Sequence, residues 1–252
     1  MTPLVRALSA ELLKLRRTLA LWMCLIAPAT VVVLLVLQMT FSRGPAMQPT
    51  PEAAWLMFAH GVLGIWCFLM LPLFVTLQSA LLAALEHSEN QWKHLLALPL
   101  PRHVHYVAKW VALVVLLLVA FVVLCVLVPI GGWVLDLLKP DFGIGGPPPL
   151  WMLVRTSAAA FAASLLIVSL HTWIALRWRS FTVAVAIGMS ATVCGFLIGQ
   201  SERFGYWYPW SMPLHVMAGK GQHLELVVLV GVAGGLVVAL LGPLDFGRRD
   251  VS

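Results

Sequence analysis

The chain has 252 residues, of which 61% are hydrophobic and only 10% are charged, and its formal net charge is +6. With a mean hydropathy of +0.96, a soluble domain of this length could not hide its apolar surface from water, so the composition excludes that class. In a polytopic membrane protein the excess of Lys and Arg encodes topology, and we therefore expect membrane lipid and no nucleic acid as a partner.

The first eighteen residues (1–18) are predicted to form an amphipathic helix. Leucines recur there at spacings of three and four, which places them on one face, and basic residues point away from that face. Such a helix lies in the plane of the interface, with its basic side toward the lipid headgroups. The alternative is a plain basic patch that only sets topology. The stripe consists of Leu4, Leu8, Leu12, Leu15 and Leu19, and the opposing basic residues are Arg6, Lys14 and Arg17.

Six stretches of the chain are long enough to cross a bilayer, whose core of roughly 30 Å needs about 20 mostly apolar residues in a helix. The connections between them are too short for a separate domain, so we expect one all-α integral membrane domain over residues 1–252. The first stretch is longer than the roughly 7–15 apolar residues of an export signal, which argues against cleavage. The predicted spans are Leu19–Phe41, Ala59–Leu85, Val107–Leu135, Trp151–Leu176, Phe181–Gln200 and Leu224–Leu244.

The four cysteines fall one each in four different spans, and none has the spacing of metal ligands or of a redox pair. We expect them to have packing roles within the lipid-embedded spans and expect no metal site. Pairs of small residues at a spacing of four predict close helix contacts, within the chain rather than at a dimer seam. These residues are Cys24, Cys67, Cys125 and Cys194, and the pairs Ala159/Ala163, Gly195/Gly199 and Gly231/Gly235.

The connection between the second and third spans (86–106) has the pattern of a short amphipathic helix. Acidic residues occupy its first turn, an aromatic and two leucines share one face, and a proline ends it. Joined to two spans, such a helix suits mechanical coupling to a soluble partner, with Trp92 as the anchor. A helix that rests on the membrane, with Trp92 among the headgroups, is the alternative. The residues of the pattern are Glu86, Glu89, Trp92, Lys93, Leu95, Leu96 and Pro99.

Polar side chains inside the spans are candidates for lining a substrate pathway, because unsatisfied polar groups in lipid are costly. Each could equally hydrogen-bond to a neighbouring helix. The candidates are His60, Gln78, His171 and Thr172.

The connection before the last span (201–223) is densely aromatic. One interpretation is an aromatic belt at the membrane–water boundary. The other is a partly re-entrant element that closes the outer end of a pathway. The aromatic residues are Tyr206, Trp207, Tyr208 and Trp210.

Orientation follows from the basic residues. With six spans the two termini share a side, and eleven Lys and Arg residues lie on that side against five on the other. This bias places both termini, the 86–106 connection and the Arg177–Ser180 hairpin in the cytoplasm.

The layout resembles the permease subunits of ABC-2-type transporters, and most closely the lantibiotic-immunity permeases of bacteria. The resemblance rests on the opening Leu8–Arg17, on Glu86, on Trp92-Lys93 with Pro99, and on Lys109 at the start of the third span. It implies a half-transporter in the bacterial inner membrane that pairs with a second permease subunit, identical or related. Two ABC ATPase subunits would bind ATP and Mg²⁺ and act on the Glu86–Leu98 coupling helix. The implied function is export of an amphipathic or hydrophobic cargo, such as a peptide antibiotic, in immunity or resistance.

The sequence has no ATPase motif of its own, so we expect no catalytic residue and no cofactor in this chain. A P-loop needs G-x-x-x-x-G-K-[ST], and the one Gly-Lys pair, Gly219-Lys220, is followed by Gly221. An intramembrane protease is disfavoured because Ser190 lacks a Gly-x-Ser-Gly context and His87 lacks a His-Glu-x-x-His context. An ATP-independent carrier or channel is the main alternative; it predicts charges or broken helices near the midplane.

Overall fold

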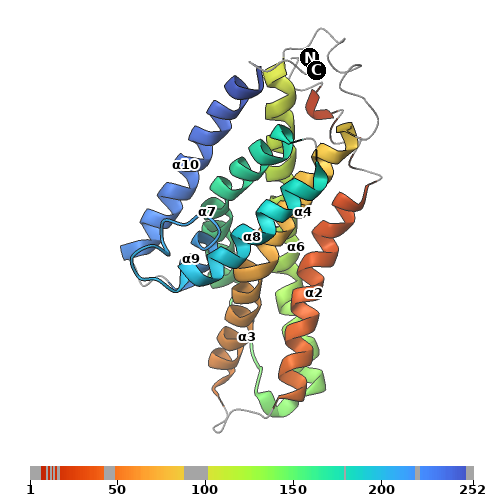
Figure 1. Cartoon of the computed structure of the whole chain (residues 1–252). Helices are drawn as coiled ribbons and strands as arrows, with labels where there is room; N and C mark the ends of the chain where they lie inside the picture. The colour runs from red at the N-terminus through yellow and green to blue at the C-terminus, as the bar shows by residue number, and fades with distance from the viewer. Residues whose placement is uncertain are drawn as a thin grey trace.

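The structure, a computed structural model, describes residues 7–9, 11, 13, 15, 18–42, 49–87, 102–178, 180–218 and 222–247. Of residues 85–87, 102, 218, 222 and 246–247 it describes the backbone alone. Every regular element in this part of the chain is a helix, which confirms the predicted fold class (Figure 1). In chain order these are α2 (Leu19–Phe41), α3 (Pro51–Ile65), η1 (Trp66–Met70), α4 (Leu71–His87), α6 (Arg102–Leu138), η2 (Pro140–Phe142), α7 (Leu150–Arg177), α8 (Phe181–Gly199), α9 (Met212–Ala218) and α10 (Gln222–Gly247).

Six helical segments are long and apolar enough to cross a membrane, in agreement with the six predicted spans. The first has the predicted limits, Leu19–Phe41. The second begins at Pro51, eight residues before the predicted Ala59. Its start is a helix cap: the Thr50 side chain accepts a hydrogen bond from the Ala53 amide at 3.3 Å, and Pro51 occupies the first turn. A cap of this kind begins a helix regardless of hydropathy, which is why the apolar window missed it.

The second span is irregular at its centre. Residues Trp66–Met70 form a π-helix between α3 and α4, and the Leu71 amide donates to the carbonyl of Trp66, five residues earlier. Pro72 follows directly and has no amide hydrogen to continue the α-helical ladder. Wide turns of this kind occur where the ladder is interrupted and are frequent at functional sites. The sequence analysis did not predict this break.

The third span is much longer than a bilayer requires. Helix α6 runs for 37 residues, which at about 1.5 Å per residue is roughly 55 Å, against a hydrocarbon core of roughly 30 Å. It begins five residues before the predicted Val107 and ends three after Leu135. The extra turns carry α6 beyond the membrane core, toward the predicted coupling segment.

Close helix contacts depend on glycine, as the small-residue pairs predicted. A Cβ atom on Gly231 would lie 2.5 Å from the Ala163 Cα, and one on Gly235 would lie 2.8 Å from the Leu165 carbonyl carbon. Helix α10 therefore packs directly against the backbone of α7 within the chain. Gly195 and Gly199 on α8 lie instead against Trp210 and Ser211 of the aromatic connection.

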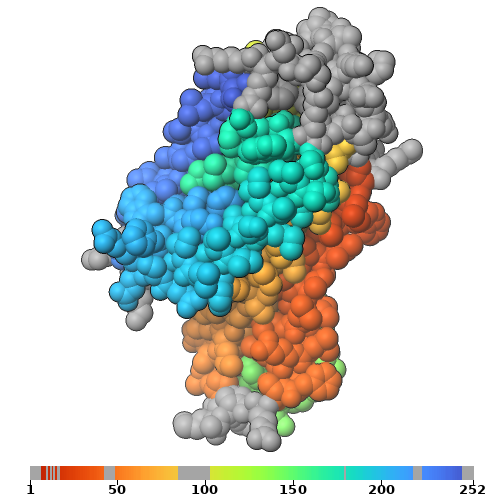
Figure 2. All heavy atoms as spheres, viewed as in Figure 1, coloured from red at the N-terminus to blue at the C-terminus, as the bar shows by residue number. Residues whose placement is uncertain are grey.

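The described part of the N-terminal helix and the end of α10 lie at the same end of the bundle (Figure 1). The end of α2, the start of α3 and the α6–α7 connection lie at the opposite end, whereas the connection that contains α9 lies beside the middle of the bundle. Figure 2 shows the α8–α10 region as a block on one face, with α2 and α3 extending past it. The aromatic connection thus turns at a different level from the other two.

Candidate functional site

The structural feature nearest to the predicted coupling segment is a polar junction where α4 ends and α6 begins. Residues 88–101, which include Glu89, Trp92, Lys93, Leu95, Leu96 and Pro99, lie outside the described residues. Glu86 lies in the last turn of α4, where the structure describes the backbone alone. The junction is therefore formed by the residues that flank the segment on both sides.

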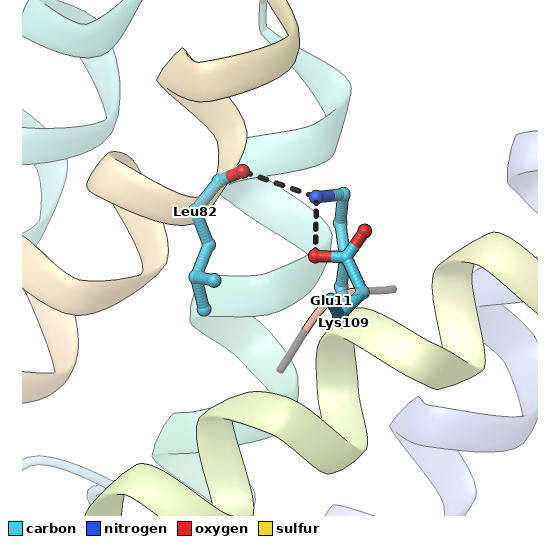
Figure 3. Close-up of polar contacts among 3 residues, drawn as sticks. All are labelled: Glu11, Leu82 and Lys109. Atoms are coloured by element: carbon cyan, nitrogen blue, oxygen red, sulfur yellow. Dashed lines mark hydrogen bonds and ion pairs between the residues drawn. The ribbon is translucent and has the colours of Figure 1, made fainter. Parts of the chain in front are cut away.

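Three segments meet at the Lys109 ammonium (Figure 3). Its Nζ lies 3.4 Å from Oε2 of Glu11 in the N-terminal helix and donates to the carbonyl of Leu82 on α4 at 3.1 Å. The two charged side chains are almost completely enclosed, with exposed fractions of 4% for Lys109 and 7% for Glu11. We call Glu11, Lys109 and the Leu82 carbonyl the entry junction.

Helical spacing explains why these residues meet. Ala7, Glu11 and Leu15 are four residues apart and are all buried, so they share the inner face of the N-terminal helix. On α6, Val104 and Ala108 precede Lys109 by five residues and by one, and both pack against Ala7. The described residues of the lead-in before Thr18 are helical, as predicted.

Two members of the predicted Leu stripe are described in this helix: Leu15 is buried and Leu8 is half-buried. Leu4 and Leu12 lie outside the described residues, and Leu19 is the first residue of α2, where it is 55% exposed. The buried face also includes the Glu11 carboxylate, beside the Lys109 ammonium.

Because the entry junction is buried, its two charged side chains strongly restrict how the N-terminal helix, α4 and α6 can be placed. Each of the two charges would be costly in an apolar interior, and each offsets part of the cost of burying the other. A void of about 10 Å³ borders Lys109 and is also lined by Ser79 and Thr172. The predicted pathway residue Thr172 is thus a neighbour of the junction, and its hydroxyl donates to the Val168 carbonyl at 2.8 Å.

A second polar cluster lies deeper, between α4, α7 and α8. His171 is fully buried, and its Nε2 is 3.2 Å from Oγ1 of Thr76. Because the single Thr76 hydroxyl hydrogen goes to the Pro72 carbonyl at 2.8 Å, His171 must donate through Nε2. A Cβ on Gly188 would lie 2.2 Å from Thr76 Oγ1, so only glycine lets α8 approach this pair.

The other two predicted pathway residues differ from each other. Gln78 is fully buried, and its amide nitrogen donates to the Ala20 carbonyl at 2.7 Å, which ties α4 to α2. His60 is exposed on α3. Gln78 and His171 therefore hydrogen-bond to neighbouring helices, as their alternative interpretation held, whereas Thr172 bonds within α7; a pathway role for any of the four stays a prediction.

The four predicted outer aromatics occupy distinct environments. Tyr206 lies between two imidazoles, with ring centroids 4.5 Å from His215 and 4.3 Å from His223. The Tyr208 hydroxyl donates to the Ala191 carbonyl of α8 at 2.9 Å, and Trp210 meets His171 edge to face at 5.5 Å. The fourth, Trp207, is 60% exposed. The connection is thus packed onto α7, α8 and α10 by three of its four aromatics.

Burial shifts two titrating groups in this outer connection. Burial raises the pKa of the Tyr208 phenol, and the neighbouring Cys194 raises it further. Burial lowers the pKa of His215, and His223 lowers it further, against the raising effect of a hydrogen bond with the backbone at Gly199. Both groups therefore favour their neutral forms, which suits an aromatic element packed against apolar helices.

A further junction joins α7 and α10 at the end that bears the termini. Arg177 Nη1 lies 3.2 Å from Asp245 Oδ2, and Trp173 Nε1 donates to the same oxygen at 3.0 Å. The Arg177 guanidinium also lies over the Trp173 ring, 5.2 Å from its centroid. We call Arg177, Asp245 and Trp173 the exit junction. Its ion pair is partly solvated, with exposed fractions of 32% and 40%.

Sequence reasoning counted Lys109 and Arg177 as topology signals and assigned no role to their acidic partners. Glu11 is the one acid in an otherwise basic lead-in, and it repeats at four-residue spacing with Ala7 and Leu15. That spacing could have identified an inward-facing carboxylate, but no sequence signal names its partner. In the described part of the chain no group of three or more His, Cys, Asp or Glu side chains could hold a metal ion.

Comparison with known proteins adds one finding. Residues 7–195 match the family model described as "ABC-2 family transporter protein". No curated protein and no solved structure matches the chain. The matched range includes the entry junction, the π-helix and the buried histidine cluster, and it ends within α8.

Proposed function

Since this chain belongs to the ABC-2 transporter family and is accordingly a permease component of an ABC transporter, we propose that separate ATPase subunits drive it through residues 86–101. The observation that carries the proposal is the entry junction. Lys109 contacts Glu11 and Leu82, so the two helices that flank the segment and the N-terminal helix are joined at one buried point.

This arrangement favours a mechanical role for the segment. A force applied to it by an ATPase would act on α4 and α6 together, because Lys109 holds the end of α4 beside the first turns of α6. Packed helices shift as rigid bodies rather than deform, so the motion would pass along both spans into the membrane. The π-helix at Trp66–Met70 gives the second span a natural point at which to bend.

The cargo we propose is amphipathic or hydrophobic, and in the narrowest form a peptide antibiotic of the lantibiotic class, exported for immunity. The spans present apolar side chains outward, and the buried polar groups are hydrogen-bonded inside the protein: Gln78 and His171 to neighbouring helices and Thr172 within α7. A pathway between two such permease subunits, identical or related, would therefore be mainly apolar. The aromatic connection at residues 201–223 would close its outer end. The positive-inside bias supports cytoplasmic termini, and the resemblance to bacterial permeases supports an inner-membrane location.

Co-purification tests the proposal. The full chain, extracted from its native membrane, is expected to bring down a stoichiometric ATPase, and Trp92→Ala is expected to lose both that partner and export. Trp151→Ala, which truncates a tryptophan 78% exposed at the start of α7, is the matched control and should retain both. An ATPase still bound to Trp92→Ala, with export intact, would show that the coupling assignment is wrong. A native chain that never brings down an ATPase would favour the ATP-independent carrier or channel instead.

A further inference from the structure

An apolar groove of about 310 Å³ runs between α2 and α6, away from both junctions. The two helices lie side by side along this length (Figure 1). Buried Val32 and Val36 form its floor, and Val33 and Val134, which are 55% and 40% exposed, stand at its rims. All the side chains that line it are apolar, so water would be a poor occupant.

Glycine explains why the groove exists. A Cβ on Gly131 would lie 2.4 Å from Cγ1 of Val32, so α2 and α6 approach each other closely there. With no side chain on Gly131 and small ones on α2, the space above this contact remains open between the larger rim residues. The opening faces outward from the bundle, where a membrane-embedded chain meets lipid.

The length of the groove matches one leaflet. Its lining extends from Ala29 to Leu37 on α2 and from Leu127 to Leu138 on α6. At about 1.5 Å per residue these stretches cover roughly 12 and 17 Å, close to half of a hydrocarbon core of roughly 30 Å. An extended acyl chain of one leaflet has the same reach.

A cation stands at one end of the groove. Lys139 follows the last lining residue of α6, and its Nζ donates to the carbonyls of Met39 at 3.0 Å and Ser42 at 2.6 Å, at the end of α2. Carbonyl contacts leave the positive charge in place and one of the three ammonium hydrogens unused. Among the described residues no carboxylate lies within ion-pair distance of Lys139. The charge is therefore available to an anion at the level of the headgroups.

We propose that this groove is a phospholipid site: one acyl chain lies between α2 and α6, and the phosphate of that lipid meets the Lys139 ammonium. The apolar walls and the length of the groove match an acyl chain of one leaflet. The ammonium at the end of the groove matches the phosphate of the headgroup. The lipid acts as a structural partner that completes the packing of the α2–α6 pair. It is distinct from the transported cargo, and the site does not depend on the proposed function.

Photolabelling locates the occupant. Full-length protein is reconstituted in vesicles of phosphatidylglycerol that carries a diazirine in one acyl chain, irradiated and digested. Crosslinked lipid is expected to concentrate on residues 29–37 and 127–138. Equal labelling of the exposed faces of α8 and α10 would overturn the proposal in favour of ordinary annular lipid. Label on other exposed faces with none on residues 29–37 and 127–138 would overturn it, and is the result expected if a second copy of the chain covers the groove.

A matched pair of substitutions tests the acyl part. Ala29→Phe places a ring in the groove, whereas Ala233→Phe adds the same ring at an exposed position of α10. Phosphatidylglycerol retained by the purified protein, measured by native mass spectrometry, should fall by about tenfold or more in Ala29→Phe, because displacing two methylenes is worth that factor. Ala233→Phe should retain it. Equal retention by the two variants would overturn the acyl assignment, and their melting temperatures control for folding.

A neutral amide tests the phosphate contact. Lys139→Gln keeps an N–H donor for the end of α2 and removes the charge. Its affinity for phosphatidylglycerol should fall by about tenfold, the weight of a charged hydrogen bond. Its affinity for diacylglycerol with the same chains, which lacks the phosphate, should not change. An unchanged affinity for phosphatidylglycerol, or an equal loss for both lipids, would overturn the phosphate contact.

Discussion

The entry junction and the exit junction use the same chemistry at similar distances, but in different surroundings. Glu11 and Lys109 are 3.4 Å apart with exposed fractions of 7% and 4%, whereas Arg177 and Asp245 are 3.2 Å apart with 32% and 40%. An exposed pair contributes about 0–1 kcal/mol, because water solvates both charges when the pair is broken. Breaking a buried pair strands a charge in an apolar interior and costs about 3–5 kcal/mol. The buried entry junction therefore contributes more than the exit junction to holding its helices in place.

The largest expected effect is that of Lys109→Met. Removing the ammonium takes away the cation that lies 3.4 Å from the buried Glu11 carboxylate and the donor to the Leu82 carbonyl. We expect the free energy of unfolding to fall by about 3–5 kcal/mol. Denaturant titration of the full chain in mixed micelles measures it. A loss below about 1 kcal/mol, the value for an exposed pair, would show that burial does not make the entry junction stronger than the exit junction.

Replacing both charges should restore much of that stability. In Glu11→Leu/Lys109→Met both members of the pair are removed, and apolar replacements of buried pairs are often neutral or stabilising. We expect the double variant to be more stable than Lys109→Met alone by about 2 kcal/mol or more. The same titration, completed as a double-mutant cycle, gives the coupling energy. If the double variant loses the sum of the two single losses, Glu11 and Lys109 do not act as a pair.

At the exit junction, Trp173→Phe should have a moderate effect. It removes the indole donor to Asp245 and retains an aromatic face beneath Arg177. We expect a loss of about 1 kcal/mol, the net value of one hydrogen bond to a partly solvated acceptor. Trp178→Phe is a suitable control, because its ring also lies beneath Arg177, at 5.4 Å. A similar loss in the control would assign the effect to ring packing.

The smallest expected effect is that of Arg177→Gln. Water can solvate Asp245 once the guanidinium is gone, so we expect a loss below about 1 kcal/mol. Raising the salt concentration from about 0.1 M to 1 M should shrink this loss further, since the Debye length falls from roughly 10 Å to 3 Å. Unfolding titrations at the two salt concentrations measure it. A large loss of unfolding free energy that does not change with salt would show that the exit junction behaves as a buried ion pair, like the entry junction.

The fold was largely predictable from the sequence, because each membrane-spanning helix needs its own stretch of about 20 mostly apolar residues. Such a stretch can be recognised without knowing the rest of the fold. The first span has the predicted limits at both ends, and Phe181 correctly begins the fifth. The errors came from signals other than hydropathy. Thr50 and Pro51 begin the second span earlier through a helix cap, and Pro72 accompanies a π-helix that an apolar window cannot register.

The candidate site was less accessible from the sequence. Glu11 and Lys109 are 98 positions apart, and no periodicity links the two helices that carry them. His171 and Thr76 are 95 positions apart and meet where Gly188 admits α8. Sequence patterns marked His171, Gln78 and Thr172 as unusual for a membrane span but could not specify their contacts.

The amino-acid sequence was therefore sufficient for the class of protein and the number of helices long enough to cross a membrane, since hydropathy acts residue by residue against a uniform solvent. The orientation read from Lys and Arg placement stays a prediction. Which charges are buried and which are partly solvated depended on how the helices pack. Lys109 and Arg177 carry the same charge in the sequence. They differ because Lys109 is enclosed by three segments, whereas Arg177 reaches water. The energy of an ion pair depends on how well water solvates its two charges.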